Sequence, residues 1–194
     1  MSCTELYRIN KKGDVSLYET FGNSHFGAMT LWSKIFEQYK EVYFPEEQYL
    51  HALLGGDNQS DFWNLYKKKE FPEFLSILLL NSYDKVMIKR EDFPILIKAL
   101  KEFDRLFIEE NTNDHYLAYI DSLEKLSKDR YCIGICWNQT SINCNPWNIY
   151  KDEDSETGEM LEIEDIVDRD YNIFQDEELG QYFLDLKNPK KDIY

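Results

Sequence analysis

The cysteines are the first residues whose type and spacing could support a metal site or a nucleophile. Cys132 and Cys136 stand four residues apart in a strand-like run, and Cys144 follows. Zinc takes four nitrogen or sulfur ligands in a tetrahedron, usually from short CxxC-type loops. A strand places residues i and i+4 on one face but roughly 13 Å apart, at about 3.3 Å per residue. The spacing therefore predicts buried reduced thiols, no structural metal at these three cysteines and no cofactor.

The histidines and hydroxyl side chains show no catalytic spacing. His25, His51 and His115 lie far apart, and the chain has neither a G-x-S-x-G turn nor a phosphate-binding loop. His25 lies in a loop before an expected helix, where it is either a site residue or a capping or packing residue. Cys136 with a distant histidine is a conceivable pair, and the 37 acids are too many to single out two for acid–base work. The sequence therefore predicts that the protein is not an enzyme.

One acidic stretch partly matches a calcium-binding loop. Asp168, Asp170 and Asn172 have the spacing of the first three ligands. The sixth position of that loop is Ile173 rather than Gly, and the twelfth is Leu179 rather than Glu. A register that starts fifteen residues earlier has the Gly and the Glu but lacks the early Asp and Asn ligands. Both stretches favour solvated acidic turns, and weak calcium binding stays open.

The net charge of −15 is concentrated in one part of the chain. Residues 1–151 carry 22 acids and 18 Lys or Arg, whereas residues 152–186, here named the acidic segment, carry 14 acids and a single Arg. Nucleic-acid binding needs a basic face that displaces counterions from phosphates, and an anionic membrane surface attracts the same kind of face. The sequence therefore predicts that neither nucleic acid nor membrane is a partner.

The acidic segment has three interpretations: a solvated face that keeps the protein soluble, a docking surface for a basic protein, or a mimic of phosphate groups. Aromatic side chains stand among its acids, and an interface needs aromatic anchors inside a polar rim. This pattern suits the docking surface best. The candidate binding residues are Asp168, Asp170, Tyr171, Phe174, Asp176, Glu177 and Glu178.

The clearest element pattern lies between residues 84 and 138, where strand, helix, helix and strand follow one another. The strands are expected near 85–90 and 130–138. Asp92 stands where a helix N-cap belongs, because its carboxylate could accept the free backbone N–H groups of the first turn. Pro94 follows in that turn, where a missing N–H costs nothing.

Both helices of this pattern have one apolar face, which indicates that they cover a sheet. Apolar residues recur at three- and four-residue spacing, with a polar break at 109–113 between the helices. We expect Leu100 and Phe103 to be buried. The face residues are Phe93, Leu96, Ile97, Leu100, Phe103 and Phe107 in the first helix, and Tyr116, Tyr119, Ile120, Leu123 and Leu126 in the second.

The N-terminal part predicts a β-hairpin over 4–21, because two strand-like runs flank a Gly-Asp turn signal. Alternation puts Leu6, Val15 and Leu17 on one side of this hairpin, and it leaves Tyr7, Ile9, Glu19 and the register undecided.

Several short helices are expected after the hairpin. The first spans 27–43, and the next three begin at Pro45, at Ser60 or the residue after it, and at Pro72. Four helices in succession indicate a helical layer on the sheet.

The chain divides into an α+β core domain, 1–150, and a C-terminal segment, 151–194. That segment contains regularly spaced apolar residues, so we expect it to pack on the core. It is predicted to contain a hairpin between 147–150 and 160–163 and a terminal helix over 177–186. The expected fold is one α+β domain whose antiparallel sheet is covered by several helices.

The composition also sets the expected class of function. The longest purely apolar run is Ile77–Leu80, and no signal-peptide pattern opens the chain, so the protein is expected to be cytoplasmic. Small acidic chains without catalytic motifs are similar in composition to proteins that neutralise a basic enzyme, such as immunity proteins and phage-type inhibitors. The leading expectation is a binding or inhibitor protein for a basic partner, such as a toxin or a nuclease. The alternatives are an enzyme with a dispersed site, in a cleft that holds His25, Trp32 or Cys136, and a structural protein.

Overall fold

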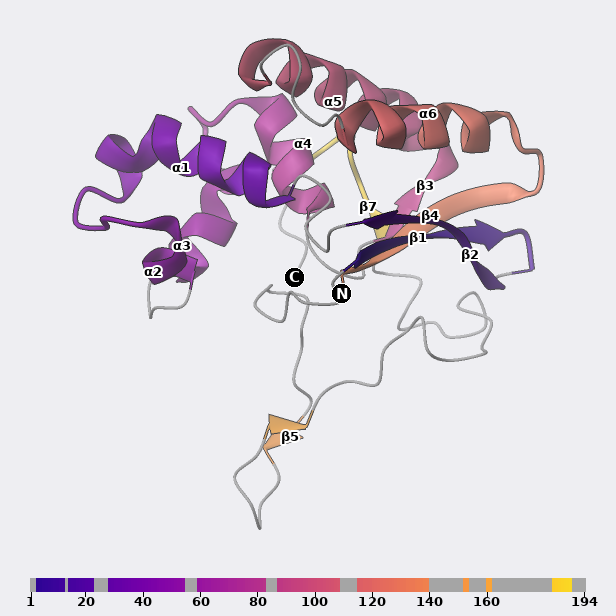
Figure 1. The fold of residues 1–194 in the computed structure, drawn as a ribbon, viewed down its shortest axis with the longest axis horizontal. Coiled ribbons are helices and arrows are strands. Elements are labelled where there is room, and N and C mark those ends of the chain that lie inside the picture. Colours follow the sequence, from indigo (N-terminus) through magenta and orange to yellow (C-terminus); the bar gives the residue numbers. More distant parts are fainter. Residues whose placement is uncertain are drawn as a thin grey trace.

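The computed structural model describes residues 3–12, 14–22, 28–54, 59–82, 87–108, 115–139, 152–153, 160–161 and 183–189. Within these residues the fold is α+β, as predicted, with a five-stranded sheet and six α-helices (Figure 1). The strands of the main sheet are β1 (Cys3–Asn10), β2 (Val15–Gly22), β3 (Met87–Lys89), β4 (Cys132–Gln139) and β7 (Phe183–Leu184). The helices are α1 (Ala28–Tyr43), α2 (Leu50–Leu54), α3 (Gln59–Trp63), α4 (Glu73–Asn81), α5 (Phe93–Phe107) and α6 (His115–Lys128).

The sheet has the strand order β2-β1-β4-β3-β7. The hairpin β1–β2 and the pairs β1–β4 and β4–β3 are antiparallel, and only β7 runs parallel to its neighbour, β3. The predicted hairpin over 4–21 and the predicted strands near 85–90 and 130–138 are thus confirmed. The parallel edge strand was not predicted.

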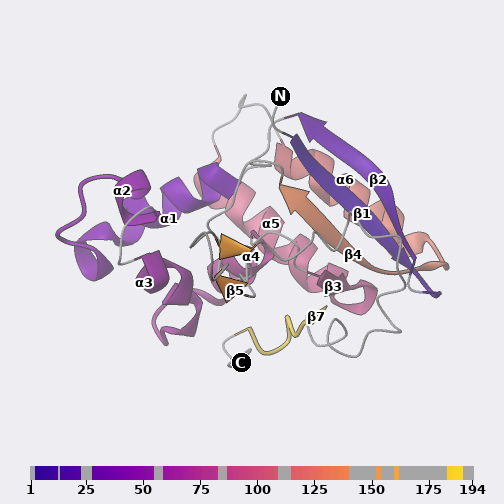
Figure 2. The same cartoon turned by 90° about the horizontal axis from the view of Figure 1, so that it is seen from below.

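The helices form a layer on one side of the sheet. Figure 1 shows α5 and α6 over one face of the strands and α1–α4 to the side of the sheet, and Figure 2 shows the same arrangement from below. The main hydrophobic core lies between the helices and this face, and it includes Leu6, Ile88 and Ile135 from the strands. Leu100 and Phe103 of α5 are 2% and 0% exposed, as their spacing predicted.

The opposite face of the sheet, here named the far face, carries a second, smaller cluster. Ile9, Met87 and Cys136 form it, and Tyr7, Val15, Ile133 and Phe183 pack against it. Met87 and Ile88 alternate between the two clusters, as neighbours in a strand must.

A register shift corrects the prediction for the hairpin. Leu6 pairs with Glu19 but Tyr7 pairs with Leu17, so the residue between them, Tyr18, is an extra residue in β2. Because each single-residue step reverses the face, Leu6 and Glu19 lie on the helix side and Leu17 lies on the far side. Leu17 is 54% exposed, and its predicted place beside Leu6 is wrong.

The start of one short helix also differs from the prediction. The N–H of Glu47 donates to the carbonyl oxygen of Phe44 over 3.0 Å, so Pro45 is the second residue of a turn rather than the first of a helix. Helix α2 begins only at Leu50. Helix α4 follows Pro72 as predicted.

The described parts of the C-terminal segment include two pairings. Strand β5 (Asp152–Glu153) pairs antiparallel with β6 (Met160–Leu161). The predicted first strand of a hairpin here, 147–150, lies outside the described residues. The predicted terminal helix is wrong at 183–186, because Phe183 and Leu184 form a strand there. Leu184 of this strand and Leu186, in the turn that follows it, both join the main core. The proposed division at residue 150 stays a prediction.

Candidate functional site

The seven candidate binding residues lie outside the described part of the chain. They are Asp168, Asp170, Tyr171, Phe174, Asp176, Glu177 and Glu178. Cys144 and His25 also lie outside it. What the structure describes of the acidic segment is the β5–β6 hairpin and the attachment of its end to the sheet.

The end of the acidic segment is attached to the sheet through β7. Phe183 pairs with Met87 and Leu184 pairs with Ile88. Leu184 and Leu186 are 3% and 1% exposed within the main core. Burial of an aliphatic side chain stabilises by about 1.5–3 kcal/mol, so these two residues hold the segment against β3.

Gly134 of β4 makes this attachment possible. A Cβ atom at that position would lie 2.7 Å from the carbonyl oxygen of Ile88 and 2.9 Å from Cε1 of Phe183. Both distances are shorter than ordinary contacts, so only glycine lets the Phe183 ring lie against the sheet at this point. The ammonium of Lys89 lies 6.0 Å from the centre of the same ring, within reach of a cation–π interaction.

Lys187 adds an electrostatic contact just beyond β7. Its Nζ lies 3.7 Å from Oδ1 of Asp92 and 3.9 Å from Oε1 of Glu91. The Asp92 side chain is only 4% exposed, and among the described residues its Oδ1 has no hydrogen-bond partner. Burial raises the pKa of the Asp92 carboxyl, and the charge of Lys187 opposes that rise. Asp92 occupies the predicted N-cap position of α5, but its side chain makes no capping hydrogen bond.

Two buried polar pairs join the helices around α4. Nε1 of Trp32 donates to Oγ of Ser82 over 2.7 Å, and the Tyr119 hydroxyl donates to Oδ1 of Asn81 over 3.2 Å. Burial raises the pKa of Tyr119 well above its ordinary value, so its proton stays in this bond. These pairs are consistent with a structural role, because buried polar groups need partners. Trp32 is itself 2% exposed.

A third polar pair links the sheet to α6. The Ser122 hydroxyl lies within hydrogen-bond distance of two acceptors, Oε2 of Glu19 and the carbonyl oxygen of Ala118, and its single proton can go to either. The pair depends on the register shift in β2, which turns Glu19 toward the helices. The sequence offered no signal for it.

Arg8, Arg90 and Asp129 organise the corner between α6 and β4. Nη1 of Arg8 lies 3.0 Å from Oδ2 of Asp129, and Nη1 of Arg90 donates to the Asp129 carbonyl oxygen over 2.8 Å. The backbone N–H of Tyr131 donates to Oδ1 of Asp129, and this bond, with the Arg8 side chain, lowers the pKa of the Asp129 carboxyl. These contacts fix the entry into β4.

Cys132 and Cys136 lie on opposite faces of the sheet. Ile9 pairs with Gly134 and Asn10 pairs with Cys132, so β4 has an extra residue that reverses the face. Cys132 therefore joins the main core and Cys136 the far-face cluster, and the prediction of one shared face is wrong. Burial raises the pKa of the Cys132 thiol, which disfavours the reactive thiolate.

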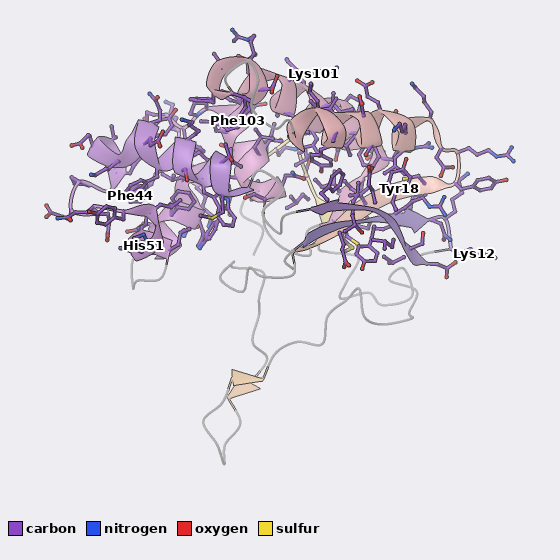
Figure 3. The ribbon with its side chains drawn as sticks, viewed as in Figure 1. Lys12, Tyr18, Phe44, His51, Lys101 and Phe103 are labelled. Atoms are coloured by element: carbon purple, nitrogen blue, oxygen red, sulfur yellow. The ribbon has the colours of Figure 1, made fainter. Side chains whose placement is uncertain are left out.

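The described residues show no arrangement of a nucleophile and a base around these thiols. His51 of α2 stacks on Tyr49, remote from β4, which carries Cys132 and Cys136 (Figures 1 and 3). Within the described ranges, no three His, Cys, Asp or Glu side chains could hold a metal ion together.

None of the helices that the structure describes is long and apolar enough to span a bilayer. Comparisons with protein families, with curated proteins and with solved structures find no match for this chain.

Proposed function

We propose that this protein binds a basic protein and neutralises it, in the manner of an immunity protein or an inhibitor, and that it has no catalytic activity of its own. One observation carries the proposal: residues 152–186 hold 14 acids against one Arg, while residues 1–151 are nearly neutral. Such a charge distribution attracts a basic partner over long range, speeds encounter and sets orientation.

The proposed contact residues belong to two classes. Asp168, Asp170, Asp176, Glu177 and Glu178 supply steering charges, and Tyr171 and Phe174 supply anchors that desolvate on binding. Because β7 ties the end of the acidic segment to the sheet, these residues are tethered to the core on their C-terminal side. Tethering lowers the ordering entropy that a free tail would lose on binding.

The proposal is tested by association kinetics with a basic protein captured from the native host. In the variant Asp168→Lys, Asp170→Lys, Glu177→Lys, we expect a fall in the association rate of tenfold or more at low salt. The difference should shrink at physiological ionic strength, because charges are screened over about 8 Å there. Tyr171→Ala and Phe174→Ala should instead raise the dissociation rate.

A matched control distinguishes the effect of charge in the acidic segment on the association rate from the effect of total net charge. Glu41, Glu46 and Glu70 are exposed residues of the helical part, and their reversal to Lys changes the net charge by the same amount. This control should alter the association rate much less than the reversal in the acidic segment. Equal effects of the two variants, or capture that recovers no basic protein, would remove the support for the proposal.

A further inference from the structure

One end of the sheet gathers positive charge, although the whole chain has a net charge of −15. Asn10 at the end of β1 pairs with Cys132 at the start of β4. The guanidinium groups of Arg8 and Arg90 both donate to Asp129, which lies just before β4. Figures 1 and 2 show the end of β1 and the connection from α6 to β4 at the same end of the sheet. Three stretches of the chain, here named the basic corner, therefore meet: 8–14, 89–92 and 125–131.

The basic corner carries eight Lys or Arg and four acids, a formal net charge of +4. Each acid already has a contact with an amide or a basic group. The four acids are Asp14, Glu91, Asp92 and Asp129. By contrast, Lys11, Lys12, Lys125 and Lys128 are exposed, and within the described residues they form no ion pair. Their positive charge is therefore available to a ligand.

The backbone on both sides of the basic corner is held by hydrogen bonds. Oδ1 of Asn10 accepts from the N–H of Lys12 over 2.7 Å and from the N–H of Asp14 over 3.1 Å. Across the corner, the N–H of Cys132 donates to the carbonyl oxygen of Asp129 over 3.1 Å. A surface that is fixed before its ligand arrives loses less conformational entropy on binding.

Tyr131 gives the basic corner an exposed aromatic ring. It is 55% exposed and directly precedes Cys132, so it lies beside the turn that follows Asn10. Nη2 of Arg130 donates to the Tyr131 hydroxyl over 2.5 Å, and the guanidinium carbon lies 4.6 Å from the centre of the ring. Tyr and Arg are the residue types that most often anchor a protein interface.

We propose that the basic corner binds an acidic stretch of another protein, with Tyr131 as the anchor and the exposed lysines as a charged rim. The net charge of the chain repels an anionic ligand more strongly the more charges that ligand carries. A nucleic acid carries a charge at every phosphate, whereas a peptide with a few carboxylates is repelled less. This inference goes beyond the proposed function, because a basic partner would be repelled from this corner.

The test uses a short fluorescein-labelled peptide of Glu and Leu residues, with binding followed by fluorescence anisotropy at low salt. The unaltered protein should bind this probe, and binding should weaken as salt is added, because the lysines are exposed. The variant Lys11→Glu, Lys12→Glu, Lys128→Glu should weaken binding tenfold or more.

A matched control keeps the change in net charge and moves it away from the basic corner. In the variant Lys34→Glu, Lys40→Glu, Arg105→Glu, the reversed charges lie on α1 and at the end of α5. This variant should weaken binding of the peptide by no more than about twofold. The melting temperatures of both triple variants show that each is folded.

Tyr131 is tested separately from the charges. Tyr131→Ala should weaken binding severalfold at low salt and by a similar factor at higher salt, because burial of the ring does not depend on screening. Tyr131→Phe keeps the ring and should retain most of the affinity.

Four results would overturn the inference. The first is a peptide that does not bind the unaltered protein at low salt, and the second is an equal loss of affinity in the two triple variants. The third is a labelled single-stranded oligonucleotide of the same charge that binds more tightly through the same lysines, since the corner would then be a nucleic-acid site. The fourth is a dimer that dissociates on dilution and is abolished by the Lys11, Lys12 and Lys128 changes, because a second copy of the chain would then be the partner.

Discussion

Gly134 has no side chain, and this leaves the room in which the Phe183 ring of β7 lies against the sheet. Its position allows the carbonyl group of Ile88 and the ring of Phe183 to approach together. The two obstacles to a larger residue differ in kind, because the carbonyl belongs to the backbone of β3 whereas the Phe183 ring can rotate away.

We expect Gly134→Ala to destabilise the fold by about 1–3 kcal/mol, the usual cost of overpacking. Urea unfolding measures this cost. In the double variant Gly134→Ala, Phe183→Ala, the clash with the ring is removed and the clash with the carbonyl of Ile88 remains. The loss of unfolding free energy in the double variant should therefore be smaller than the sum of the losses in the two single variants. A Gly134→Ala protein as stable as the unaltered chain would contradict the close approach.

Asp92 is a second residue whose environment predicts a measurable effect. Because burial raises its pKa in the folded state, the folded chain holds this proton more tightly than the unfolded chain does. Its contribution to stability is therefore greatest below the ordinary carboxyl pKa and is lost as the pH rises through the raised value.

We expect Asp92→Asn to gain stability relative to the unaltered protein at about pH 7 and to lose this advantage at about pH 3, below the ordinary carboxyl pKa, where the Asp92 side chain is protonated in both states. Urea unfolding at the two pH values measures the difference. Lys187→Ala serves as a control for the loss of the ion pair, whose lysine is 59% exposed. A constant difference between the proteins at both pH values would show that the Asp92 carboxyl does not titrate as expected.

Helix α5 joins the sheet to the rest of the helical layer through one apolar face. Phe93, Leu96, Leu100 and Phe103 are all buried in the main core, and Ile97 and Phe107 are partly buried at its edge. Figure 3 shows the opposite side of the same helix through Lys101, which points away from the core.

We expect Leu100→Ala to cost about 2–5 kcal/mol and Phe103→Ala about 3–5 kcal/mol, since each leaves a cavity in the core. The matched control is Lys101→Ala. Its side chain is 57% exposed and pairs with Glu124, and such surface ion pairs contribute about 0–1 kcal/mol. The free energy of unfolding is measured by heat or urea. Equal values for all three variants would contradict the packing of α5.

The whole molecule carries a net charge of −15, most of it between residues 152 and 186. Like charges gathered in one segment repel one another, and this repulsion is larger in the compact state than in the expanded chain. Salt screens it over about 10 Å at 0.1 M.

We therefore expect the melting temperature to rise with NaCl between about 0.01 and 0.3 M, by about 2–4 °C for each kcal/mol of relieved repulsion. Neutralisation of Asp168, Asp170 and Asp176 to Asn should reduce the salt response. Neutralisation of the exposed Glu41, Glu46 and Glu70 to Gln, outside the segment, should preserve most of the salt dependence of the melting temperature. A melting temperature that falls with salt would show that attraction, not repulsion, dominates the field.

Local patterns in the sequence determined the α+β class, the hairpin and the faces of α5 and α6. The spacing from Phe93 to Phe107 is a property of neighbours three and four residues apart, so it needs no knowledge of the fold. The same holds for the strand-like runs around the turn at Asp14. The sequence also determined where the charge lies, although that observation alone supports only a proposal about a partner.

Tertiary structure decided the features that depend on residues distant in the chain. The extra residues in β2 and β4 turned Glu19 toward Ser122 and separated Cys132 from Cys136, because a one-residue shift in pairing reverses the face of every later side chain. The ring of Phe183 in β7 lies against Gly134, nearly fifty residues earlier in the chain. Periodicity within one segment carries no record of such pairings, since their free energy comes from contacts that form only when the strands meet.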